Sequence, residues 1–177
     1  MNGISQLWSW LGLSSREPQE SSALRDVVNA LDRLEPDRAR YVARFAYLLG
    51  RVAQADQQAS AEETATMERL VREEGSLTPD QAVLVVKLAK TSNLLFGGTA
   101  DFEVARDFDA SATYEEKLAL ARCLFAVAAS EDSISMTEET EIHRILNQLK
   151  IQPHDLTAIR VAHRAHLPGI APVPRKS

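Results

Sequence analysis

Apolar residues recur along most of the chain at spacings of three and four positions, the period of an α-helix that buries one face. The clearest stripe lies in segment 38–55 and comprises Tyr41, Phe45, Leu48, Leu49 and Val52. No segment alternates between apolar and polar residues as strictly as a half-buried strand would. The pattern therefore predicts an all-α fold.

Start signals divide this pattern into separate helices. Capping boxes, in which Ser or Thr is followed three positions later by Glu or Gln, begin at Ser60, Thr78, Thr113 and Ser135. Pro36 and Pro153 stand where first-turn prolines occur. A loop is expected at 93–99, around the only Gly-Gly pair. The predicted helices cover about 22–34, 38–55, 60–75, 78–90, 102–108, 113–130, a segment from 135 onward, and 153–166.

Composition narrows the class of protein. The 177 residues include only seven Gly and seven Pro, which favours long helices, and 45% are apolar, enough for one well-formed core. A net charge of −5 argues against a nucleic-acid-binding protein, which needs a clustered basic excess. The single cysteine and the lack of a long apolar run or a secretory signal indicate a cytoplasmic protein.

Two stretches, 41–90 and 117–164, share one plan of helix, acidic turn, helix, short turn and helix. Asp56 and Asp132 are 76 positions apart, as are Glu62 and Glu138, while the two prolines at 79 and 153 are 74 apart. We therefore expect a single domain over 21–166, with about seven helices in two three-helix repeats at about 36–90 and 113–166. A pseudo-twofold relation between these halves is the expected arrangement.

The duplicated acidic turns have two interpretations. Acidic residues in a first helical turn are favoured by free backbone N–H groups and the helix dipole, so they would serve only as caps. Alternatively, carboxylates from both repeats would converge on a divalent cation, Ca²⁺ or Mg²⁺, since hard cations prefer such ligands. The spacing is not that of an EF-hand loop. The candidate metal ligands are Asp56, Glu62, Glu63, Glu131, Asp132, Glu138 and Glu139.

The stretches AQADQQASAEETATMERL and AASEDSISMTEETEIHRIL resemble the two motif copies of the TerB family of bacterial tellurite-resistance proteins. The family is similar to the N-terminal domain of membrane-anchored DnaJ-like co-chaperones. Its pattern, roughly A-x-A-D-G-x-x-S-x-x-E, matches Ala53, Ala55, Asp56, Ser60 and Glu63, and then Asp132 with Glu138 or Glu139. The resemblance covers about residues 36–166.

This resemblance implies a duplicated all-α domain, a role in bacterial stress response and tellurite resistance, and a cytoplasmic or inner-membrane-associated setting. It also implies a divalent cation at the acidic loops, although Gln57 and Ser133 stand where the family has Gly. No other cofactor is expected. The chain has no HPD signature, so it is not expected to act as a co-chaperone.

Both ends of the chain differ from the predicted domain. Residues 1–20 comprise an apolar segment with both tryptophans and a polar linker, and Ile4, Leu7, Trp8 and Leu11 form one helical stripe. This segment either packs on its own domain or makes a peripheral membrane or partner contact through residues 1–13. An unidentified protein partner is expected, whereas the oligomeric state is left open. The Pro-rich tail 167–177 is predicted to be disordered.

No constellation in the sequence predicts an enzyme. Cys123 lies in an apolar run and is expected to pack as a core residue. His163 and His166 share a helix face, but no second ligand pair accompanies them. Arg40, Arg44 and Arg51 form a basic stripe opposite the core stripe, expected either to face solvent or to pair with carboxylates of neighbouring helices.

Overall fold

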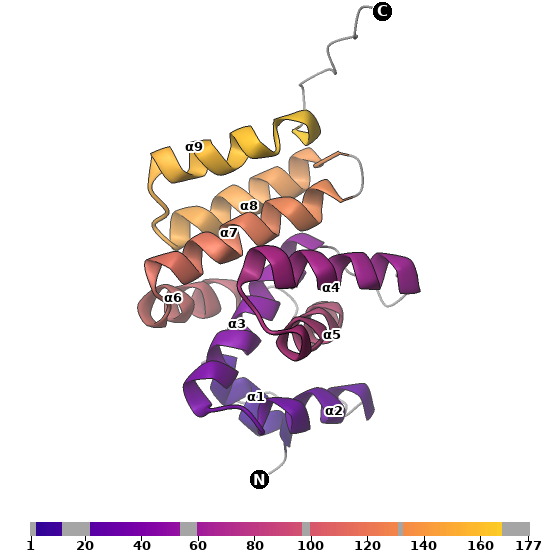
Figure 1. Cartoon of the computed structure of the whole chain (residues 1–177). Helices are drawn as coiled ribbons and strands as arrows, with labels where there is room; N and C mark the ends of the chain where they lie inside the picture. Colours follow the sequence, from indigo (N-terminus) through magenta and orange to yellow (C-terminus); the bar gives the residue numbers. More distant parts are fainter. Residues whose placement is uncertain (1–2, 12–21, 54–59, 97–99, 131–132, 168–177) are drawn as a thin grey trace, which may run out of the picture.

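A computed structural model describes residues 3–11, 22–53, 60–96, 100–130 and 133–167. This part of the chain is helical throughout and contains no strand, which confirms the predicted all-α class (Figure 1). Its elements are α1 (Gly3–Leu11), α2 (Ser22–Leu31), α3 (Pro36–Ala53), α4 (Ala61–Gly75), α5 (Pro79–Phe96), α6 (Asp101–Ser111), α7 (Tyr114–Ala129), α8 (Met136–Gln148), α9 (Pro153–Ala162) and a short 3-10 helix, η1 (Arg164–His166).

The helix ends follow the start signals closely. In all four capping boxes the Ser or Thr hydroxyl accepts a hydrogen bond from the backbone N–H of the Glu or Gln three residues later. The side-chain oxygen of that Glu or Gln accepts in turn from the backbone N–H of the Ser or Thr. The main difference is at α5, which continues to Phe96 although a loop was predicted from residue 93. Asn and Leu are tolerated within a helix, so the segment up to the Gly-Gly pair extends α5.

The two repeats form halves that pack through equivalent helices. The first half is α3, α4 and α5, and the second is α7, α8 and α9. Between halves, α3 packs on α8 while α7 packs on α4, and α3 and α7 pack on each other. Exchanging the halves leaves this set of contacts unchanged, as a pseudo-twofold relation requires. The largest fully buried side chains of the shared core are Phe45, Phe108 and Phe125.

The N-terminal helices cover one end of this domain. α1 packs on α2 and α3, while α2 also packs on α5, and together they lie at the bottom of Figure 1. Leu7, Trp10 and Leu11 are buried, so the segment packs on its own domain. Trp10 was not part of the predicted stripe, and the side chains of Ile4 and Trp8 lie outside the described residues.

At the opposite end, the 3-10 helix is tied to the start of α8. The backbone N–H of Ile134 donates to the His166 carbonyl oxygen at 2.7 Å. Leu167, which the sequence assigns to the tail, is buried in the core. The rest of that tail, 168–177, lies outside the described residues.

Candidate functional site

The acidic turns begin α4 and α8 with the same geometry in both halves. In the first half, the Glu63 N–H donates to Ser60 Oγ at 3.1 Å and the Ser60 N–H donates to Glu63 Oε2 at 2.6 Å. In the second, the Glu138 N–H donates to Ser135 Oγ at 3.2 Å and the Ser135 N–H donates to Glu138 Oε2 at 2.8 Å. One carboxylate oxygen of each glutamate is therefore used to cap its helix.

The two remaining described candidates are in different surroundings. Glu62 is exposed in the first turn of α4. Glu139 accepts a hydrogen bond from Arg160 Nη2 on α9 at 2.6 Å, and His143 Nε2 lies 3.8 Å from the same oxygen. A carboxylate already paired with a guanidinium is a poor cation ligand, because the arginine charge opposes that of the metal.

Three predicted ligands, Asp56, Glu131 and Asp132, lie outside the described residues. Within the residues that the structure does describe, no group of three or more His, Cys, Asp and Glu side chains could hold a metal ion. Glu63 and Glu138 thus cap helices, Glu139 is an ion-pair partner and Glu62 is exposed, so the described glutamates do not by themselves form a ligand set.

One pocket lies between the last turn of α3 and the first turns of α8. The cavity has a volume of about 420 Å³. We call it the seam pocket; its lining residues are Arg51, Val52, Met136, Thr137, Glu138, Thr140, Glu141 and Arg144. In the sequence, Asp56 follows the α3 residues that line this pocket, and Glu131 and Asp132 precede the α8 residues that line it.

An ion-pair cluster around Arg51 forms one side of the seam pocket. Arg51 Nε donates to Glu141 Oε1 at 2.7 Å and lies 3.5 Å from Asp101 Oδ2 at the start of α6. The Tyr47 hydroxyl donates to Asp101 Oδ1 at 2.7 Å. Burial, and then this hydrogen bond, raise the pKa of Tyr47, so the phenol stays protonated. The arginine stripe on α3 was the only sign of this cluster in the sequence.

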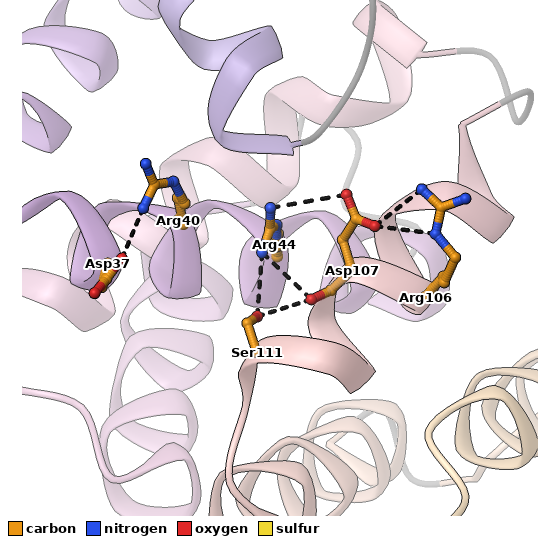
Figure 2. A network of polar contacts seen from close by, with 6 residues as sticks. All are labelled: Asp37, Arg40, Arg44, Arg106, Asp107 and Ser111. Atoms are coloured by element: carbon orange, nitrogen blue, oxygen red, sulfur yellow. Dashed lines mark hydrogen bonds and ion pairs between the residues drawn. The ribbon is translucent and has the colours of Figure 1, made fainter.

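Arg44, two turns earlier on α3, holds α6 in a similar way (Figure 2). Its Nη1 donates to Ser111 Oγ at 3.1 Å and to the Asp107 carbonyl at 3.3 Å, while Nη2 lies 3.8 Å from the Asp107 carboxylate. Burial lowers the pKa of the Arg44 guanidinium, and Asp107 acts against that effect. The buried part of the arginine stripe therefore pairs with neighbouring helices and does not face solvent.

The remaining candidates for chemistry are placed as packing groups. Cys123 is fully buried, and burial raises the pKa of its thiol, so it packs as the predicted core residue. The His163 ring stacks on Phe125 with 5.8 Å between ring centroids, and its Nδ1 lies 3.0 Å from the Ile159 carbonyl oxygen. That contact requires the proton on Nδ1. No helix within the described residues is long and apolar enough to span a membrane.

Comparisons with known proteins agree with the motif. The family model described as Tellurite resistance protein TerB matches residues 42–161, from the second turn of α3 to near the end of α9. A search of the curated proteins and a search of the solved structures give no match. The matched region spans well over half of the 177 residues and includes both copies of the acidic turn. The chain therefore belongs to the TerB family of tellurite resistance proteins.

Proposed function

We propose that this chain is a non-enzymatic interaction module of bacterial tellurite resistance and stress response, which acts in the cytoplasm by binding a protein partner. Its family membership supports the tellurite-resistance context. In this proposal the duplicated glutamates of α4 and α8 serve the fold, and recognition takes place on exposed surfaces.

The observation that carries this proposal is the pair of matched capping boxes. Glu63 and Glu138 each close a reciprocal pair of hydrogen bonds with the Ser before the helix. Glu139 is paired with Arg160 of α9. These three carboxylates therefore already have structural roles. Two of them cap their helices, as the capping interpretation of the acidic turns expects.

A divalent cation is the second candidate ligand, and one observation favours it. The seam pocket brings the end of α3, which leads to Asp56, next to the start of α8, which follows Glu131 and Asp132. Carboxylates delivered from both segments would suit Ca²⁺ or Mg²⁺. Glu138 would contribute its Oε1, since only Oε2 is used in the cap.

Calorimetric titration with Ca²⁺, Mg²⁺ and Mn²⁺ separates the two candidates. Glu63→Gln and Glu138→Gln are informative because Gln retains a capping box while it removes the charge. The interaction-module proposal predicts no saturable heat with the parent protein or with these variants. Saturable binding that Asp56→Asn or Asp132→Asn abolishes, and that Asp80→Asn at an exposed position on α5 preserves, would establish the cation site instead.

The partner is tested by affinity capture with the intact chain from bacteria grown with and without tellurite. We expect a protein that co-purifies in fixed ratio and also binds the chain after separate purification. A chain that captures nothing beyond the bait-free control under both conditions would overturn the interaction module.

A further inference from the structure

The third helices of the two halves, α5 and α9, are held to the domain to very different degrees. α5 packs on α2, α3 and α4, whereas α9 packs mainly on α7 and lies at the top of Figure 1. The described side chains that α5 buries are Ala82, Leu84, Val85, Val86, Leu88 and Ala89. All ten residues of α9 are described, and Ile159 alone is buried. Because apolar burial provides most of the energy that docks a helix, α9 is held far more weakly than α5.

Exposed polar contacts supplement the weak packing of α9. The Tyr114 hydroxyl at the start of α7 donates to Asp155 Oδ2 at 2.6 Å and accepts from the Gln152 backbone N–H at 3.0 Å. Tyr114 is 37% exposed, so water competes for both hydrogen bonds. Arg160 Nη2 donates to Glu139 Oε1 on α8, and the Arg160 side chain is 41% exposed. Hydrogen bonds and ion pairs that water can replace stabilise a structure only slightly.

The residues that follow α9 are attached to the same half of the domain. The His163 ring stacks on Phe125 of α7, which is fully buried. The His166 carbonyl oxygen in η1 accepts from the Ile134 N–H just before α8, and Leu167 is buried. α9 and η1 therefore form one continuous segment whose described polar and ring contacts are to α7, α8 and Ile134.

The first half contains an equivalent of the Tyr114 contact. Arg38 precedes Tyr114 by 76 positions and Gln81 precedes Asp155 by 74, which are the two offsets of the repeat. Arg38 Nη2 donates to Gln81 Oε1 at 2.6 Å, and so ties α3 to α5 as Tyr114 ties α7 to α9. Equivalent ties thus join a firmly packed helix in one half and a weakly packed helix in the other.

We propose that α9 and η1 form a releasable strap, which opens as one unit from α7 and α8 while the preceding helices stay folded. The open state uncovers Phe125, so the strap controls access to this apolar side chain of α7. Local opening of this kind is favoured where few apolar contacts must be broken to release a segment. The strap goes beyond the proposed interaction function, because its opening does not depend on a partner.

The test is amide hydrogen exchange of the full chain, followed residue by residue by NMR. Labelling of the native thiol of Cys123, the only cysteine and a fully buried one, measures opening of the core in parallel. Tyr114→Phe removes the hydroxyl that ties α9, and Arg38→Met, at the equivalent position of the other half, removes the tie to α5.

We expect the amides of α9 to exchange through one shared opening, roughly tenfold or more as frequent as the opening that exposes α5 or Cys123. Tyr114→Phe should raise exchange in α9 roughly fivefold. Arg38→Met should raise exchange in α5 and labelling of Cys123, but it should change exchange in α9 by less than about twofold, because the Arg38 contact is intact whether the strap is closed or open.

Three results would overturn the strap. The first is an Arg38→Met variant in which exchange rises as much in α9 as in α5, since α9 would then open only with the whole domain. The second is a set of α9 exchange rates that increase steadily toward Ala162, since the helix would then fray from its end and would not open as a unit. The third is a Tyr114→Phe variant whose exchange in α9 equals that of the parent chain.

Discussion

Arg51 on α3 donates from Nε to the Glu141 carboxylate on α8 at 2.7 Å, and so joins the two halves of the repeat. Both side chains are largely shielded from water. Asp101 at the start of α6 lies 3.5 Å from the same Nε, so one guanidinium connects three helices. The residues that build the seam pocket are therefore also residues that hold the domain together.

Removing Glu141 is expected to destabilise the protein strongly. Glu141→Ala leaves a buried guanidinium with Asp101 alone, and we expect the free energy of unfolding in urea to fall by about 2–3 kcal/mol. Arg144→Ala is the control, because Arg144 binds the same carboxylate from a 62% exposed position and should cost at most about 0.5 kcal/mol. Equal losses of unfolding free energy in the two variants would show that the buried ion pair stabilises the protein no more than the exposed one.

The capping boxes predict a second, smaller effect. Ser60→Ala and Ser135→Ala each remove the hydroxyl that accepts from the third backbone N–H, and each should lower the free energy of unfolding by about 1 kcal/mol. Glu138→Gln should cost much less, since the amide oxygen still accepts from the Ser135 N–H. Chemical denaturation of the three variants measures these differences. A Glu138→Gln variant as unstable as Ser135→Ala would contradict the capping interpretation.

The features that sequence predicted well are local ones. All four capping boxes form as expected, because each depends only on two residues three positions apart and on the backbone N–H groups of those same residues. The apolar stripe of α3 is buried for the same reason, since helical period alone determines which residues share a face. Internal repetition then predicted the division into two halves.

The pairings that form the candidate site could not be predicted in this way. Arg51 and Glu141 are separated by 90 positions, and Tyr47 and Asp101 by 54. Helical period places Arg51 on one face of α3, but it does not tell which helix packs there. The sequence therefore left open whether the arginine stripe faces solvent or carboxylates. It likewise left open whether Glu139 is a metal ligand, whereas the structure pairs it with Arg160.

The stability of the protein should depend on pH through Asp109. Burial acts to raise the pKa of this carboxyl, but hydrogen bonds and charges from Lys117 and Lys150 outweigh it and hold the pKa below its ordinary value. An aspartate carboxyl has a pKa of about 3.9 in the unfolded chain. Because the pKa of Asp109 is lower in the folded protein, its ionised form stabilises the fold above about pH 3.9, and this contribution is lost as the pH falls through the folded-state pKa.

We therefore expect the difference in unfolding free energy between the parent protein and Asp109→Asn to be constant from about pH 7 to about pH 5 and to narrow below about pH 4. Urea denaturation at each pH measures it. Asp80→Asn, at an exposed position on α5, should show a difference near zero throughout. A difference that widens toward acid would show that Asp109 is not held ionised by its two lysines.

Tryptophan fluorescence should report the docking of α1. Replacing Trp8 by Phe leaves Trp10 as the only tryptophan, and because its side chain is 6% exposed we expect blue-shifted emission with weak quenching by acrylamide. Leu11→Ser in this background should release the helix, since nine residues are too few for a stable isolated helix and its burial depends on apolar packing. Emission should then shift to the red and quenching should approach that of free tryptophan.

The unfolding transition followed by circular dichroism should remain cooperative, because α1 lies outside the TerB-matched region 42–161. Ser9→Ala, at an exposed position on the same helix, should leave both signals unchanged. Strong quenching of Trp10 by acrylamide in the variant that carries only the Trp8→Phe replacement would contradict the packing of α1 on its own domain.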